Sequence, residues 1–189
     1  LIPSHREDVN QVILRNRRIG LSQSGIIQSF QKHGIKEHIR WCNEGYEYIN
    51  ELDKKYSEWL CIPQSIKTTS IKPSGTISLL CGATPGIHYP HSKYYYRTVR
   101  IPKESDLYKH LIAANYRVEE SLYGDNTYVV YFAVEEKNFE RSKKEVTIWE
   151  QVCNAVLLQK YWSDNQVSIT VTFDNEKEGK EIPKILEVF

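Results

Sequence analysis

Apolar residues recur at three- and four-residue steps along several stretches of the chain, and this spacing places them on one face of an α-helix. The clearest series is Ile39, Cys42, Tyr46, Ile49, Leu52 and Tyr56. Shorter helical patterns cover residues 24–32, 105–115 and 147–162. A further helix is predicted near the N-terminus, where Ser4 and Glu7 have the spacing of a capping box.

Other stretches are rich in β-branched and aromatic residues or alternate between apolar and polar positions, which is typical of β-strands. They cover residues 65–71, 94–101, 127–134 and 166–173. Because the predicted strands and helices alternate along the chain, the sequence favours the α/β fold class with mainly parallel strand pairing.

The composition is that of an ordinary globular protein, with 40% hydrophobic and 26% charged residues among 189. The 25 basic and 24 acidic residues give a net charge of +1, so electrostatics does not favour nucleic acid or an anionic membrane as a partner. No apolar run reaches the length of a transmembrane helix, and no signal-peptide pattern opens the chain. We therefore expect a cytoplasmic protein.

The four cysteines include no Cys-x-x-Cys pair, so no metal-binding motif is predicted. Cys42 and Cys153 lie in helical patterns and are expected to be buried as small apolar side chains. Cys81 follows two leucines in an apolar turn and is also expected to pack internally.

The segment Pro73-Ser74-Gly75-Thr76 follows a predicted strand and opens an apolar turn. Free backbone N–H groups at such a helix start can converge on one anion, and a phosphate suits this arrangement. Pro73 fixes the local backbone, and Gly75 permits close approach by a ligand. Further donors are the hydroxyls of Ser74, Thr76 and Ser78. An ordinary strand-to-helix turn with a serine cap has the same pattern, so the residues alone leave both interpretations open.

Three blocks of the sequence carry a family resemblance. They are residues 15–22, RNRRIGLS; residues 72–101, which begin KPSGTISLLCGATPGIHYP; and residues 164–173, DNQVSITVTF. Each resembles a segment of the adenosylcobalamin-dependent (class II) ribonucleoside-triphosphate reductases, and the three occur in the order found in that family. The resemblance spans most of the chain.

The resemblance implies that residues 1–189 are a single fragment from the later part of a ten-stranded α/β barrel. Both ends are expected to be truncated, because the chain contains no methionine and stops within an apolar helical pattern at 182–189. The implied reaction is reduction of ribonucleoside triphosphates to deoxyribonucleotides, initiated by adenosylcobalamin. The implied partners are the substrate, a dithiol reductant such as thioredoxin, and the remainder of the reductase polypeptide.

The resemblance also implies which functions the chain carries. The substrate-phosphate site is expected to consist of Pro73, Ser74, Gly75, Thr76 and Ser78. Within it, Ser74, Gly75 and Thr76 are expected to contact the phosphate directly, Ser78 to contribute to the helical turn and Pro73 to set the shape of the loop. The sequence leaves three roles open for Lys72: its charge can contribute to phosphate binding, or its side chain can face solvent or line the barrel. The family's radical cysteine and its glutamate lie in an Asn-Pro-Cys-x-Glu loop, which is absent here. No catalytic, metal-binding or cofactor-binding residue is therefore assigned, and the chain alone is predicted to be inactive. His88 is expected to order its loop rather than to bind cobalt.

Two other functions remain open from the sequence. The chain can be a phosphate- or nucleotide-binding module without catalytic activity, because one fold supports many functions. It can also be a structural half-barrel that pairs with a second polypeptide.

Overall fold

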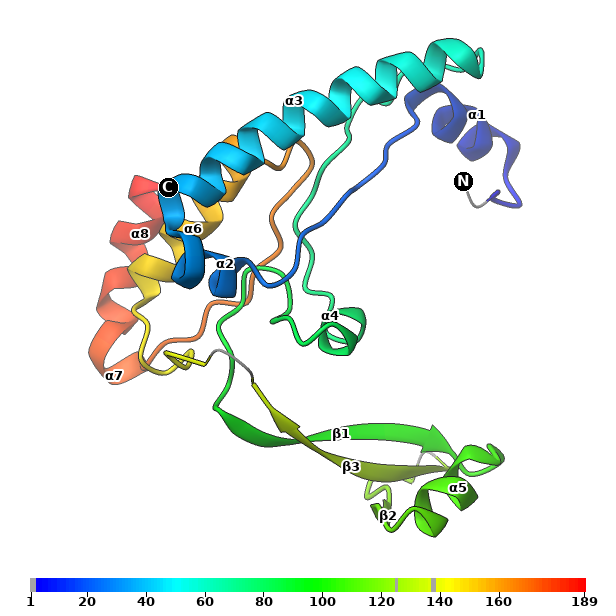
Figure 1. Cartoon of the computed structure of the whole chain (residues 1–189), viewed down its shortest axis with the longest axis vertical. Coiled ribbons are helices and arrows are strands. Elements are labelled where there is room, and N and C mark those ends of the chain that lie inside the picture. The colour runs from blue at the N-terminus through cyan, green and yellow to red at the C-terminus, as the bar shows by residue number, and fades with distance from the viewer. Residues whose placement is uncertain (1–2, 125, 137–138) are drawn as a thin grey trace. The chain divides into compact units, whose positions relative to one another are not determined.

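The computed structural model describes residues 3–124, 126–136 and 139–189. The contacts within the chain divide it into two compact units (Figure 1). Unit 1 comprises residues 1–89 and 141–189, and unit 2 comprises residues 90–140. The prediction that residues 1–189 form one fragment of a catalytic barrel stays a prediction.

Unit 1 is mainly helical. Its helices are α1 (Glu7–Asn16), α2 (Ile26–His33), α3 (Ile35–Trp59), α4 (Ile77–Leu80), α6 (Ile148–Tyr161), α7 (Asn175–Glu178) and α8 (Ile182–Val188), with a 3₁₀ turn η1 at Gly179–Glu181. The long helix α3 packs against α2 and α6. The helices predicted from three- and four-residue spacing are thus confirmed, within a few residues at their ends.

The predicted capping box at the start of α1 is wrong. The N-cap residue is Arg6, whose side chain makes no capping hydrogen bond. Ser4 instead forms a reciprocal pair with Asn10: its N–H donates to Asn10 Oδ1 at 2.7 Å, and Asn10 Nδ2 donates to its carbonyl at 3.0 Å. Because the Asn10 amide holds Ser4 outside the helix, the spacing to Glu7 has no structural consequence.

Three extended segments of unit 1, residues 19–21, 67–71 and 165–168, lie side by side, and we call them the parallel layer. Parallel bridges join Leu21 to Thr69 and Ile71 to Val167. The Ile71 N–H donates to Gln166 O at 3.0 Å, and the Ser168 N–H donates to Ile71 O at 2.8 Å. The predicted parallel pairing is present here, although only as isolated bridges.

The predictions of regular strands at 65–71 and 166–173 are therefore wrong. Within residues 166–173, side-chain oxygens accept hydrogen bonds from backbone N–H groups that would otherwise pair with a neighbouring strand. Val167 N donates to Gln159 Oε1 at 3.1 Å, and Thr172 N donates to Gln151 Oε1 at 3.0 Å. Local side-chain bonds of this kind compete with sheet pairing.

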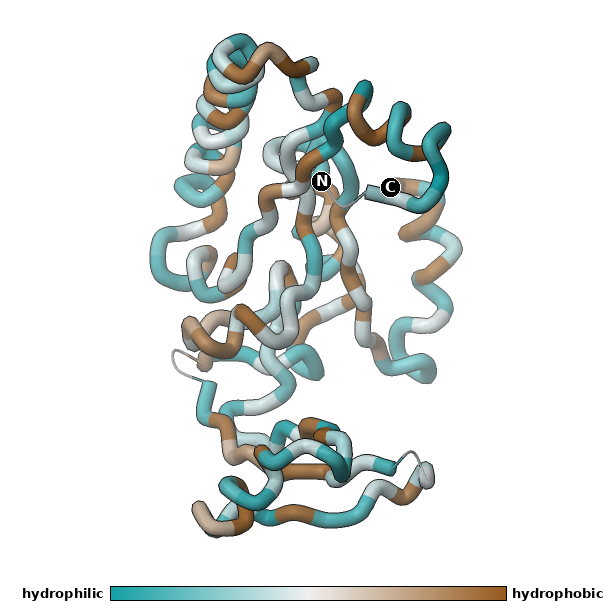
Figure 2. Tube along the Cα trace, turned by 90° about the vertical axis from the view of Figure 1, so that its right-hand side faces the viewer, coloured by the Kyte–Doolittle hydropathy of each residue, from teal (hydrophilic) through white to brown (hydrophobic). Residues whose placement is uncertain are grey.

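The helices cover one face of the parallel layer and bury the core of unit 1. Ile71, at the centre of the layer, is 0% exposed. Packed with it are Ile26, Ile27, Phe30, Cys42, Ile87, Tyr89, Val146, Leu158 and Trp162. Along the helices, hydrophobic and hydrophilic residues alternate (Figure 2), as expected when one face of each is buried.

Asp164 fixes the start of the third segment against the second. Its carboxylate accepts hydrogen bonds from the N–H groups of Thr68 and Thr69, at 3.0 and 2.9 Å, and from both threonine hydroxyls. Burial raises the pKa of Asp164, but these hydrogen bonds outweigh it and hold the pKa below its usual value. The ionised carboxylate thus joins segments that are 95 residues apart in sequence.

Unit 2 is a three-stranded antiparallel sheet with one short helix. Its strands are β1 (Tyr94–Pro102), β2 (Arg117–Glu120) and β3 (Thr127–Glu135), in the order β1-β3-β2. Helix α5 (Leu107–Ala113) precedes β2. Tyr108, in this helix, stacks on Tyr128 of β3 with ring centroids 4.8 Å apart.

The prediction of mainly parallel pairing is wrong for unit 2. Val99 and Ile101 of β1 pair antiparallel with Val130 and Tyr128 of β3. Ile101 and Val130 are buried, whereas Tyr96 on the other face is 71% exposed. A sheet with one buried and one open face is typical of antiparallel pairing. The fold class is therefore mixed α and β, and the sheet that forms regular strands is small.

Among the described residues, no helix combines the length and the apolar character that a membrane crossing requires.

Candidate functional site

The Pro73–Ser78 segment leaves the parallel layer directly after Ile71 and turns into α4. Thr76 is the N-cap residue of α4, and its side chain makes no capping hydrogen bond. Within the described part of the chain, no acceptor takes the backbone N–H groups of Gly75, Thr76 or Ile77. These three donors lie at the positive end of a helical turn, where an anion is favoured.

Ser78 closes this turn from the inside. Its hydroxyl and its N–H both donate to the carbonyl oxygen of Ser74, the N–H at 3.2 Å. Its side chain is only 3% exposed. Ser78 thus sets the shape of the turn, whereas Pro73 and Thr76 are exposed.

A second segment, residues 22–28, holds the phosphate-loop candidate in place, and we call it the brace. The Ser22 hydroxyl accepts from the Lys72 N–H at 2.9 Å, and the Ser24 hydroxyl lies 2.6 Å from that of Ser74. The brace therefore supports the loop at its entrance and at its first hydroxyl.

The brace also holds the far end of the loop. The Gln28 side chain donates to Gly82 O at 3.1 Å and accepts from the Thr84 N–H at 3.0 Å. The sequence predicted no role for Ser22, Ser24 or Gln28. A role for Ser22 could have been suspected, because Ser22 ends the block 15–22, and this block and the loop resemble the same family.

Gly86 is required where the two ends of the loop approach each other. Its φ is 52°, and a Cβ built on it would lie 2.8 Å from the carbonyl oxygen of Lys72. Any side chain there would push the ends apart. Gly75, by contrast, is not among the described glycines with positive φ, so it requires no special backbone conformation.

His88 connects the loop to the third segment of the parallel layer. Its Nε2 accepts from the Thr170 N–H at 2.9 Å, so its Nδ1 carries the proton and donates to Pro85 O at 3.0 Å. Both ring nitrogens are used, as expected for a histidine that orders its loop. Within the described ranges, no group of three or more His, Cys, Asp or Glu side chains could hold a metal ion.

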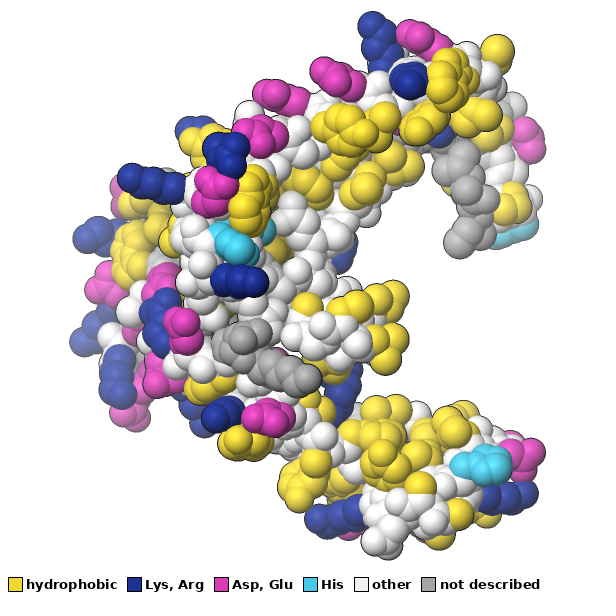
Figure 3. All heavy atoms as spheres, viewed as in Figure 1, with side chains coloured by type: hydrophobic (Ala, Val, Ile, Leu, Met, Phe, Trp, Pro, Cys, Tyr) yellow, Lys and Arg dark blue, Asp and Glu magenta, His cyan; other side chains and the backbone are white. Residues whose placement is uncertain are grey.

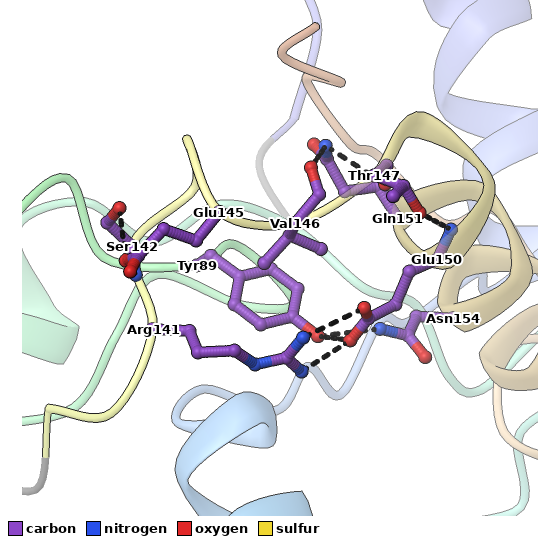
Figure 4. Close-up of polar contacts among 9 residues, drawn as sticks. All are labelled: Tyr89, Arg141, Ser142, Glu145, Val146, Thr147, Glu150, Gln151 and Asn154. Carbon is purple, nitrogen blue, oxygen red and sulfur yellow. Dashed lines mark hydrogen bonds and ion pairs between the residues drawn. The ribbon is translucent and has the colours of Figure 1, made fainter.

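A partly buried polar cluster fixes Tyr89, where the loop ends (Figure 4). The Tyr89 hydroxyl donates to Glu150 Oε1 at 2.6 Å, and Asn154 Nδ2 donates to the hydroxyl at 3.3 Å. Arg141 donates to both Glu150 oxygens, at 3.0 and 2.6 Å. Tyr89 and Arg141 are the unit 1 residues that flank unit 2 in sequence.

The titrations of this cluster follow from its contacts. Burial and the hydrogen bond to Glu150 raise the pKa of Tyr89 to about 12. The Arg141 guanidinium holds the pKa of Glu150 below its usual value. At neutral pH the cluster is therefore a neutral tyrosine, a carboxylate and a guanidinium, with its charges paired.

The cysteines differ in part from expectation. Cys42 is 1% exposed, which confirms its predicted burial, and this burial raises the pKa of its thiol. Cys81 and Cys153 are exposed, so the predictions that they are packed internally are wrong. Cys153 lies on the outer face of α6, and Cys81 caps the exposed end of α4.

The solved structure of a B12-dependent (class II) ribonucleotide reductase superposes on this chain with a TM-score of 0.82. The two sequences are 32% identical, and the match covers 97% of this chain and 30% of that one. At this identity and coverage the likeness extends over both units in sequence. The chain therefore has the fold of a segment of a class II ribonucleotide reductase.

Several curated relatives bear the name of one kind of class II reductase, the adenosylcobalamin-dependent ribonucleoside-triphosphate reductase. A probable adenosylcobalamin-dependent ribonucleoside-triphosphate reductase of Dictyostelium discoideum is 53% identical over 96% of this chain. The corresponding enzymes of Euglena gracilis and Levilactobacillus brevis are 49% and 33% identical, over 100% and 93% of the chain. No family model matches the chain.

The chain is thus homologous, along nearly its whole length, to adenosylcobalamin-dependent ribonucleoside-triphosphate reductases, which confirms the resemblance found in the sequence. It spans about a quarter of the length of these relatives.

Proposed function

We propose that this chain supplies the substrate-phosphate loop of an adenosylcobalamin-dependent reductase that converts ribonucleoside triphosphates to deoxyribonucleotides. The observation that carries the proposal is the set of N–H donors of Gly75, Thr76 and Ile77 at the start of α4, for which the described residues offer no acceptor. It is supported by the homology to reductases that bear this name.

In this proposal the loop binds and orients the substrate and does not react with it. The N–H groups and the hydroxyls of Ser74 and Thr76 hold a phosphate, while Pro73 and the buried Ser78 keep the turn in shape. Fixing the phosphate fixes the sugar to which it is attached, and such positioning lowers the barrier of a reaction at the ribose. The brace keeps these donors in place before the substrate arrives.

We assign the parallel layer to the wall of a ten-stranded α/β barrel, whose other strands belong to the remainder of the reductase polypeptide. Exposed hydrophobic side chains gather over α4 (Figure 3), where Ile77 is 69% and Leu80 88% exposed. Apolar surface of this kind is typical of a protein contact. The remainder of the polypeptide is the proposed partner for it.

When bound, adenosylcobalamin supplies the radical that starts the reaction. His88 does not fit the role of cobalt ligand, because both of its ring nitrogens are engaged. We therefore assign substrate binding to this chain and assign no cofactor contact to His88. A dithiol such as thioredoxin is the proposed reductant, and the cytoplasm is the proposed compartment because such a reductant needs reducing surroundings.

The test compares the isolated chain with a complete reductase polypeptide that carries it. With adenosylcobalamin, a dithiol and a ribonucleoside triphosphate, the complete polypeptide is expected to form deoxynucleotide and the isolated chain none. In the complete polypeptide, Ser74→Ala combined with Thr76→Val should raise the KM for the substrate severalfold. Nucleotide binding by the complete polypeptide without any reduction would instead indicate a non-catalytic nucleotide-binding module.

A further inference from the structure

A pocket of about 290 Å³ adjoins the phosphate-loop candidate, because Lys72, which lines the pocket, directly precedes Pro73. It is lined by Arg18, Ile19, Gly20, Ser70, Lys72, Asn165 and Gln166. All three sequence blocks that resemble the reductases therefore contribute to this one pocket. We call it the cationic pocket.

The charge of the pocket comes from Arg18 and Lys72. Within the described ranges, neither side chain forms a hydrogen bond or an ion pair, and both are exposed. Asp164 directly precedes Asn165 of the pocket lining, but its carboxylate accepts hydrogen bonds from the N–H groups of Thr68 and Thr69. The pocket thus contains two cations that no carboxylate among the described residues of unit 1 pairs with, which favours an anionic ligand.

The walls of the pocket carry polar groups that hydrogen bonds hold in place. Asn165 Nδ2 donates to Ile19 O at 3.0 Å and to Thr69 O at 2.7 Å, so the asparagine joins all three segments of the parallel layer. A Cβ on Gly20 would lie 3.0 Å from the hydroxyl oxygen of the buried Ser70, so glycine leaves room for that hydroxyl in the pocket wall. The side-chain amide of Gln166 is exposed at the rim.

The pocket lies on the face of the parallel layer that the helices leave open. Ile71 points into the core of unit 1, and its neighbours Ser70 and Lys72 line the pocket, as alternation along an extended segment requires. The same short segment thus has an apolar outer face for the helices and a polar inner face for a ligand.

The phosphate loop itself has no charge. Pro73, Ser74, Gly75, Thr76 and Ser78 offer only neutral donors. A nucleoside triphosphate has one phosphoryl group more than a diphosphate, and its terminal phosphate carries the greatest negative charge. Cations paired with phosphate oxygens form stronger hydrogen bonds than neutral donors do.

We propose that the cationic pocket receives the terminal phosphate of the substrate while the loop holds a phosphate nearer the sugar. Arg18 and Lys72 are then the residues that favour triphosphates over diphosphates. This inference rests on the proposed function of the loop, and it assigns to Lys72 one of the roles that the sequence left open.

The test measures KM for CTP and for CDP in a complete reductase polypeptide that carries this chain. Arg18→Ala and Lys72→Ala are each expected to raise the KM for CTP about tenfold, the scale of a lost charge-assisted contact, and to change the KM for CDP less than about twofold. Lys72→Arg should retain most of the preference. Matched controls are Arg15→Ala in α1 and Lys67→Ala in the same extended segment, neither of which lines the pocket.

The outcomes separate this inference from the proposed function. Gly75→Val is expected to raise the KM for both nucleotides, since the loop holds a phosphate that both contain. If Gly75→Val acts in this way but Arg18→Ala and Lys72→Ala weaken CTP and CDP equally, the pocket assignment is wrong and the loop assignment stands. If these two variants lower the melting temperature and leave the preference for CTP unchanged, the two cations pair with carboxylates of the remaining polypeptide and the inference is overturned.

Discussion

The two units of this chain are built from opposite kinds of contact. In unit 2, β1, β2 and β3 pair antiparallel within residues 94–135. In unit 1, the parallel layer joins segments that start at residues 19, 67 and 165, and single side chains such as Asp164 hold them together. The candidate phosphate loop extends from this layer. Its geometry therefore depends on residues far away in sequence, whereas the sheet of unit 2 has its own local core.

The largest effect is expected from Ile71→Ala, at the centre of the layer. Ile71 is 0% exposed and packs against residues of α2 and α6. Removing its side chain should cost about 3–4 kcal/mol of unfolding free energy, through lost burial and the cavity left behind. Denaturant unfolding measures this loss in unit 1. Hydrogen exchange of the amides in β1 and β3 measures whether unit 2 loses protection as well. Equal loss of protection in both units would show that their stabilities are not separate.

Asp164→Asn is expected to have the next largest effect, about 2 kcal/mol, because it removes a charged acceptor of several hydrogen bonds. The wild-type contribution is present above the ordinary aspartate pKa, near 3.8, and is lost as the pH falls through the lowered pKa of the folded state. The variant should therefore show a flatter decline of melting temperature in acid. If the melting temperature of the variant falls as steeply in acid as that of the wild type, other carboxylates cause the acid sensitivity.

Tyr89→Phe is expected to cost about 1 kcal/mol, since it removes the hydrogen bonds to Glu150 and from Asn154. The neutral tyrosine is favoured in the folded state, so its contribution is present below pH 10 and is lost as the pH rises through about 12. Tyr95 of unit 2 offers the matched case, because it donates to Glu136 at 2.8 Å and its pKa is also raised to about 12. In an absorbance titration, the Tyr89→Phe variant and the Tyr95→Phe variant should each show one fewer tyrosine that ionises near pH 12. Loss of a tyrosine that ionises near pH 10 would contradict the burial of that hydroxyl.

The smallest effect is expected from Cys81→Ala. The thiol is exposed at the end of α4, so the unfolding free energy should change by less than about 0.5 kcal/mol. In a complete reductase, turnover should be retained. A loss of turnover with intact nucleotide binding would show that Cys81 takes part in the reaction.

The contrast between the units also explains what could be predicted from the sequence. Helical spacing located α2, α3 and α6, and alternation located β1 and β3, because these patterns are local. The antiparallel pairing of β1 with β3 was missed, although the open aromatic face of β1 indicates it. The parallel layer was only partly predicted, because the side chains of Gln151 and Gln159 take N–H groups that a regular strand would use.

The candidate site was predicted in part. The loop at Pro73–Ser78 could be located, because a proline, a glycine and several hydroxyls after a strand-like segment have a recognisable pattern. The brace could not, because Ser24 and Gln28 are ordinary surface residues until the fold brings them to Ser74 and Gly82. The same holds for Tyr89 and Glu150, which are 61 residues apart in sequence.

We propose above that the substrate phosphate is held by the N–H groups around Gly75, for which the described residues offer no acceptor. The most direct measurement is the KM for a ribonucleoside triphosphate in the Gly75→Val variant of a complete reductase, together with its affinity for adenosylcobalamin. Gly45→Ala is the control, because a Cβ there meets the Trp162 ring at 3.5 Å, an ordinary contact in α3. Gly75→Val is expected to raise KM by about ten- to a hundredfold, or about 1–3 kcal/mol, and to leave cofactor affinity unchanged. An unchanged KM in a folded variant that binds the cofactor would show that these N–H groups do not hold the phosphate.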